Sequence, residues 1–180
     1  MKKECLYFKI MLISSIVVLS CFVVSLDTIS DSSQVSGETT SLLVPQTTEQ
    51  SGNKTTLQVF IDSLRGLVSK SNELTSKYQL ELGKWTTKEN DNSTMIAITD
   101  RYLSQFEELE NEASDLAVPT GQENIKESFI KSISSEAASY EHFKNYLTTG
   151  NRTEDELSID DLSLAFQYEQ VYATFLLKNR

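Results

Sequence analysis

Three Asn-x-Ser/Thr tripeptides are the patterns in this chain that most directly suggest chemistry. They are Asn53-Lys-Thr55, Asn92-Ser-Thr94 and Asn151-Arg-Thr153. In an exported protein, the side-chain amide of such an asparagine is the acceptor for an N-linked glycan. Asn, Ser and Thr also gather at helix starts, where their side chains cap free backbone N–H groups. Asn53, Asn92 and Asn151 are therefore candidate glycosylation sites, with helix capping as the alternative interpretation.

The sequence contains few residues that could bind a metal or a cofactor. His142 is the only histidine, and Ser139 stands where a Glu-x-x-His metal pair needs a glutamate. The two cysteines, Cys5 and Cys21, both precede the folded region that we expect. We therefore predict no metal and no cofactor, and expect His142 to face solvent or to be satisfied by hydrogen bonds.

Acidic residues form two bands, one from Glu107 to Asp115 and one from Glu154 to Asp161. Neither band has the alternating acids followed by glycine that wrap a calcium ion. We expect both to be solvated helix faces. The chain also has no Gly-x-Ser-x-Gly, phosphate loop, dinucleotide fingerprint or Cys–His pair, so we predict that it is not an enzyme. A hydrolase that uses a pair of these carboxylates is the alternative.

Three tyrosines in the second half of the chain are candidates for a binding groove. Tyr168 and Tyr172 are one helical turn apart, and Tyr140 lies on the preceding predicted helix. Aromatic rings at these positions could stack on a small ligand, which would make the chain a ligand sensor. The alternative is that Tyr140, Tyr168 and Tyr172 belong to a mixed core of Tyr, Phe and Leu.

The elements that must position these residues are helices. Apolar residues recur at steps of three and four from Leu57 onwards, and no segment shows strand alternation. The pattern predicts four helices, with Thr55 or Thr56 capping the first, Pro119 ending the second and Gly150 ending the third. Thr153 opens the fourth, and Ser158 with Asp161 is the alternative start. Short connections favour an all-α, antiparallel four-helix up-down-up-down bundle at residues 57–180. A last helix docked across a three-helix core is the alternative.

The N-terminal segment 1–26 has the pattern of a signal or a membrane anchor. Lys2, Lys3 and Lys9 precede the nearly uninterrupted apolar run 10–26. That run is about 17 residues, or roughly 25 Å as a helix, which is at the short end of a membrane span. Three outcomes stay open: an uncleaved anchor with the lysines inside, a lipoprotein with Cys21 lipidated in the lipobox-like Val18-Leu-Ser-Cys21, or a secreted product.

Residues 27–56 are rich in Ser, Thr, Gln and Gly and predict a flexible linker. Of the 16 basic and 26 acidic residues, three basic and one acidic residue precede Leu26, which leaves 13 against 25 and a net charge of −12 beyond it. Such a surface repels phosphate backbones, so we predict no nucleic-acid partner.

An anchor, a linker, sequons and a helical bundle together resemble the small exported proteins of unknown function on prokaryotic cell surfaces, including archaeal ones. The resemblance is architectural, and it carries over no functional residue. It implies a protein held on the membrane by its N-terminal segment, with its domain on the extracytoplasmic side. We expect a protein-interaction module that binds an envelope or extracellular partner, and the sequence leaves the oligomeric state open.

Overall fold

The computed structural model describes residues 54–180, which form four helices. Their bounds are Thr56–Thr86 (α2), Asn92–Ser114 (α3), Glu123–Thr149 (α4) and Arg152–Lys178 (α5). The predicted segment 1–26 with Cys21, most of the predicted linker and Asn53 lie outside the described residues. Within residues 54–180, no helix is both long enough and apolar enough to cross a membrane.

Polar side chains and one glycine set most of the helix ends. Oγ1 of Thr55 accepts a hydrogen bond from the backbone N–H of Gln58 at 3.2 Å, as the sequence predicts for the start of α2. Oδ1 of Asp91 accepts from the N–H of Thr94 at 2.7 Å and caps α3. Gly150 ends α4 with a φ of 70°, a left-handed conformation that a residue with a Cβ rarely adopts.

The end of α3 differs from the prediction. The helix stops at Ser114, so Leu116 lies in the loop before Pro119 and not on the helix. Lys126 explains part of this early end, because its ammonium donates to the carbonyl oxygens of Ser114 at 2.5 Å and Leu116 at 3.0 Å. The first of these bonds satisfies the carbonyl of the last helical residue, which has no later N–H of the helix to accept from.

The start of α5 also differs, by two residues. Asn151, not Thr153, is the N-cap, and its Oδ1 accepts a hydrogen bond from the N–H of Thr153 at 3.1 Å. Asparagine is among the strongest capping residues, so the helix starts as soon as the chain leaves Gly150.

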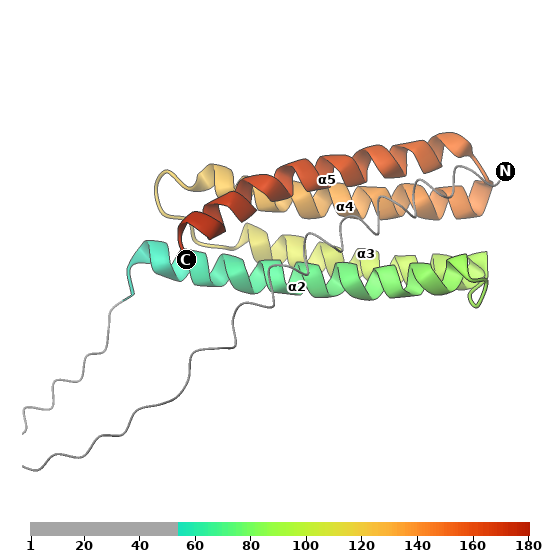
Figure 1. Ribbon diagram of the computed structural model, residues 1–180, viewed down its shortest axis with the longest axis horizontal. Helices are drawn as coiled ribbons and strands as arrows, with labels where there is room; N and C mark the ends of the chain where they lie inside the picture. Colours follow the sequence, from blue (N-terminus) through green and yellow to red (C-terminus); the bar gives the residue numbers. More distant parts are fainter. Residues whose placement is uncertain (1–53) are drawn as a thin grey trace, which may run out of the picture.

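Successive helices run in opposite directions, and each contacts its neighbours in sequence (Figure 1). α3 packs against α2 and α4, whereas α5 packs extensively on α4 and contacts α2 and α3 far less. The predicted all-α arrangement of four helices is confirmed. Its last helix rests mainly on one partner, which leaves much of α5 open on the outside.

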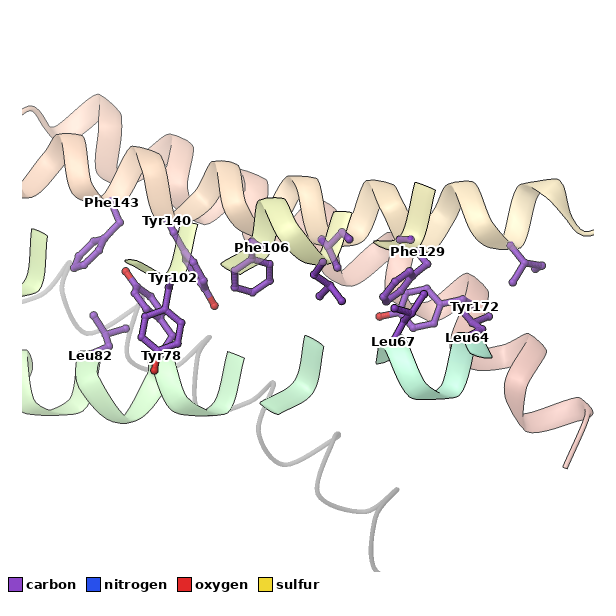
Figure 2. Close-up of a cluster of buried hydrophobic side chains, with 14 of the residues drawn as sticks. Leu64, Leu67, Tyr78, Leu82, Tyr102, Phe106, Phe129, Tyr140, Phe143 and Tyr172 are labelled. Atoms are coloured by element: carbon purple, nitrogen blue, oxygen red, sulfur yellow. The ribbon is translucent and has the colours of Figure 1, made fainter. Parts of the chain in front are cut away.

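The core is aromatic along most of its length (Figure 2). The ring of Tyr78 from α2 stacks on that of Tyr140 from α4, with 3.9 Å between centroids, and meets Tyr102 from α3 edge-on at 5.3 Å. Farther along, Phe129 from α4 meets Tyr172 from α5 edge-on at 5.3 Å. Two groups of rings therefore lie along the bundle, and Figure 2 shows Leu64 and Leu67 beside the second.

Small residues hold α4 and α5 close together. Ser132 and Ser139 are seven residues apart on α4, and each donates a hydrogen bond from its hydroxyl to a backbone carbonyl of α5. The acceptors are Ala165 at 2.9 Å and Ser158 at 2.7 Å, which are also seven residues apart. All four residues are buried. A hydroxyl can reach the backbone of the facing helix only where no larger side chain stands between them, so this seam requires small residues.

Candidate functional site

The two candidate glycosylation residues within the described chain lie at the same end of the bundle (Figure 1). Asn92 opens α3, and its side chain accepts a hydrogen bond from Nε1 of Trp85 at 2.9 Å and donates to the carbonyl of Leu147 at 3.4 Å. Asn151 caps α5. Both asparagines are exposed. Each therefore has a structural role, and both remain predictions as glycan acceptors.

Replacing Asn151 with alanine or aspartate tests the capping role. We expect Asn151→Ala to lower the free energy of unfolding by about 1 kcal/mol, because it removes the acceptor for the N–H of Thr153. Asn151→Asp keeps a capping oxygen while removing the sequon, so it should stay close to the original stability in denaturant titrations. Equal losses in the two variants would contradict the capping role.

The three candidate groove tyrosines do not line one open groove. Tyr140 is 1% exposed and Tyr172 is 4% exposed, and both rings belong to the core described above. Tyr168 is partly buried on the outer side, where the ammonium of Lys131 lies 5.6 Å from its ring centroid. Core packing, the alternative interpretation from the sequence, accounts for Tyr140 and Tyr172.

His142 is satisfied by carboxylates across the α4–α5 seam. Its Nδ1 lies 2.7 Å from Oε2 of Glu154, and its Nε2 lies 3.5 Å from Oδ2 of Asp161. The hydrogen bond from His142 lowers the pKa of Glu154 below its ordinary value. Because each ring nitrogen faces a carboxylate, neither is directed at the nearby hydroxyls of Ser139 and Ser158, which bond to the facing backbone and to each other.

The acidic band on α3 does not converge on a point. Glu107 and Glu108 are exposed, Glu110 accepts a hydrogen bond from the hydroxyl of Ser134 at 2.8 Å, and Glu112 pairs with Lys70 on α2. Among residues 54–180, no group of three or more His, Cys, Asp or Glu side chains is arranged to hold a metal ion.

The most unusual titratable group is one that sequence reasoning missed. Glu136 of α4 is 8% exposed and lies between the two aromatic groups of the core. Its Oε1 accepts hydrogen bonds from the hydroxyl of Tyr140, one turn ahead, and from Oγ1 of Thr75 on α2 at 2.7 Å. Tyr78 and Thr99 extend this polar layer with a hydroxyl contact of 3.0 Å.

Burial raises the pKa of Glu136 to about 7. The hydrogen bonds from Tyr140 and Thr75 favour the charged form and oppose this rise, while the nearby charge of Glu169 on α5 adds to it. Burial also raises the pKa of Glu169. The charge of Glu169 therefore disfavours ionisation of Glu136, whereas the raised pKa of Glu169 has its own burial as the cause.

A sequence signal for Glu136 does exist. Ile125, Phe129, Ser132, Glu136, Ser139 and Phe143 follow one another at alternating steps of four and three, and all six are buried. A carboxylate in such a series occupies a core position. The apolar residues of this helix do not reveal Ser132, Glu136 and Ser139. The two serines form the hydrogen bonds between α4 and α5, and Glu136 is the buried acid.

Comparison of the chain with protein-family models, with curated proteins and with solved structures finds no match.

Proposed function

We propose that this chain is a membrane-tethered, extracytoplasmic protein-interaction module without catalysis, an antiparallel up-down-up-down bundle carried on an N-terminal anchor and linker. The tether is supported by the basic start at Lys2 and Lys3, the apolar run that follows and the polar linker 27–56. The interaction role is supported by a single feature of the described residues, the outer side of α5.

The outer side of α5 carries an apolar stripe of Leu157, Leu164 and Val171, which we call the α5 stripe. Their exposed fractions are 38%, 38% and 40%. Residues seven apart are almost two full helical turns apart, so the three side chains lie along one side of the helix. α5 packs mainly on α4, and these three side chains keep more than a third of their surface exposed. Aligned apolar residues of this kind are what a docked helix contacts.

The negative charge around the α5 stripe indicates which kind of partner helix could bind there. Glu156 and Asp160 are exposed next to the stripe, and the chain beyond Leu26 has a net charge of −12. A second copy of this chain would bring like charges together, whereas an amphipathic helix with basic flanks would pair its charges with these acids. The partner that we propose is therefore a basic amphipathic helix of an envelope or extracellular protein.

A peptide titration tests this proposal. The probe is a synthetic helix with leucine along one face and lysine on both flanks, titrated into the full chain held in zwitterionic lipid nanodiscs and followed by fluorescence anisotropy. We expect saturable binding that Leu164→Asp weakens roughly tenfold or more, because the substitution places a carboxylate at the centre of the apolar contact.

Two controls separate this contact from general attraction between charges. Leu80 on α2 is 69% exposed and lies away from the stripe, so Leu80→Asp adds the same charge at an unrelated position and should leave binding unchanged. A peptide of the same composition in scrambled order, and empty nanodiscs, should bind weakly. Equal weakening by the two substitutions, or equal binding of the scrambled peptide, would reject the α5 stripe as the docking surface.

A further inference from the structure

His142 of α4 joins two carboxylates of α5 that lie beside the α5 stripe. Its Nδ1 is 2.7 Å from Oε2 of Glu154, and its Nε2 is 3.5 Å from Oδ2 of Asp161. Glu154 and Asp161 are seven residues apart, and each stands three residues before a leucine of the stripe. Residues three apart are neighbours on a helix surface, so these two acids, which we call the border carboxylates, flank the stripe on the side that faces α4.

The contact between the imidazole and the border carboxylates reaches the surface of the bundle. The side chain of His142 is 29% exposed, and those of Glu154 and Asp161 are 24% and 28% exposed. The side-chain amide of Asn145 on α4 also donates to Glu154. Solvent and a docked partner can therefore reach the same carboxylates that His142 contacts.

Other charged groups around the imidazole interact with partners of their own. Lys144 on α4 lies 2.7 Å from Glu141 on the same helix and 3.1 Å from Asp100 on α3. At the start of α5, the positive charge of Arg152 acts on Asp155. The imidazole is therefore the group of α4 that contacts both border carboxylates.

The charge state of His142 decides how many border carboxylates it can hold. A protonated imidazole donates from both ring nitrogens, so it can bond to Glu154 and Asp161 together. A neutral imidazole donates from one nitrogen only, and its other nitrogen presents a lone pair. The shorter contact is the one between Nδ1 and Glu154, so a single remaining hydrogen is best placed there and Nε2 has none for Asp161. Loss of one proton therefore releases the carboxylate of Asp161.

We propose that protonated His142 competes with a basic partner helix for Asp161 and so regulates docking on the α5 stripe. This inference rests on the proposed function, because Asp161 borders the surface on which that helix docks. In mildly acidic solution the imidazolium holds Asp161 and places a positive charge near the lysines of the partner. After the imidazole loses its proton, Asp161 can pair with one of those lysines. Both effects have the same sign, so binding is tighter at higher pH.

Titration of a basic peptide at two pH values tests this competition. The peptide and the full chain in nanodiscs are those described for the α5 stripe, and anisotropy is recorded at pH 5.5 and pH 8, on either side of the range in which histidine ordinarily changes charge. The lysines of the peptide stay charged at both values. We expect the Kd to be about threefold to fivefold lower at pH 8, the effect of one partly exposed ion pair. His142→Gln cannot gain a charge, so it should bind with the same Kd at both pH values.

Two neighbouring acids of α5 provide a matched pair of variants. Asp161→Asn removes the carboxylate for which the imidazolium and the partner compete, so it should raise the Kd at pH 8 and remove most of the pH dependence. Asp160→Asn removes the exposed acid next to it in sequence, so it should raise the Kd by a similar factor at both pH values. A pH dependence that survives in His142→Gln would belong to another group, such as the buried Glu136, and would overturn the inference.

A measurement on the unsubstituted chain keeps the test independent of folding in the variants. His142 is the only histidine, so a chain with isotope-labelled histidine gives one imidazole signal in nuclear magnetic resonance spectra. Coupling between two binding events is reciprocal, so a bound peptide must make protonation of this ring less favourable. We expect the ring signal to titrate at a lower pH with the peptide than without it. Identical titrations with and without saturating peptide would overturn the competition.

Failure of this inference is distinguishable from failure of the proposed function. Absence of saturable peptide binding at both pH values would reject the α5 stripe as a docking surface. Saturable binding that Leu164→Asp weakens, but that has the same Kd at pH 5.5 and pH 8, would retain the docking surface and reject the role of His142.

Discussion

Tyr78→Ala is expected to lower the free energy of unfolding by about 3–5 kcal/mol, the range found when a large buried aromatic side chain is removed from a core. Tyr78 is fully buried, its ring stacks on Tyr140 and meets Tyr102 edge-on, and its hydroxyl lies 3.0 Å from Oγ1 of Thr99. Alanine would leave a cavity among three helices, because the neighbouring rings are themselves fixed by packing. Chemical denaturation monitored by circular dichroism measures the loss.

Two matched substitutions divide this effect into its parts. Tyr78→Phe keeps the ring and removes only the hydroxyl, so it should lose about 1 kcal/mol, since Thr99 retains its hydrogen bond to the carbonyl of Met95. Leu80→Ala, two residues farther along α2 but 69% exposed, should change stability by less than about 0.5 kcal/mol. A loss in Tyr78→Ala no larger than that in Leu80→Ala would mean that the stacked rings are not the centre of the core.

Ser139→Leu is the second substitution with a large expected effect, a loss of about 2–4 kcal/mol. Ser139 is fully buried and donates to the carbonyl of Ser158 at 2.7 Å, so the larger side chain must push α5 away from α4. Overpacking of this kind costs about 1–3 kcal/mol, and the lost hydrogen bond adds about 1 kcal/mol. Denaturant titration gives the total, and hydrogen exchange should show the amides of α5 losing protection first.

Ser139→Ala is the control for this prediction, because it removes the hydroxyl without adding volume. We expect it to lose only about 1 kcal/mol and to leave the exchange protection of α5 nearly unchanged. If Ser139→Leu lost no more stability than Ser139→Ala, this would contradict the close packing of α4 against α5 at this position.

The apolar period of the sequence was sufficient to predict four helices and much of their buried faces. Phe129, Tyr140 and Phe143 are core residues in the structure, as their spacing indicates. Capping chemistry placed Thr55 and Gly150 correctly, because a cap acts within a few residues of the chain. Asn151 was predicted as a glycosylation site with helix capping as the alternative, and in the structure it caps α5.

The buried acid and the α4–α5 seam could not be derived in the same way. Glu136 and its donor Thr75 are 61 residues apart, and nothing local specifies which hydroxyl will face a carboxylate across a bundle. The spacing of Glu136 places it on the inner face, but its pKa depends on the distance to Glu169 and on burial by three helices. Serine occurs on both buried and exposed helix faces, so apolar periodicity does not place Ser132 or Ser139. Their small size becomes informative only once α5 is known to pack against them.

Because successive helices run in opposite directions, each helix end lies either at the end of the bundle where residue 54 leads into α2 or at the opposite end. Arg65 bonds to Asn179, so the last turn of α5 lies beside the first half of α2, at the end where Lys54 enters (Figure 1). α2 has 31 residues and is therefore about 45 Å long, and Asn92 and Asn151 lie at its far end. A bulky attachment at either asparagine would therefore lie at the opposite end of the bundle from the last turn of α5.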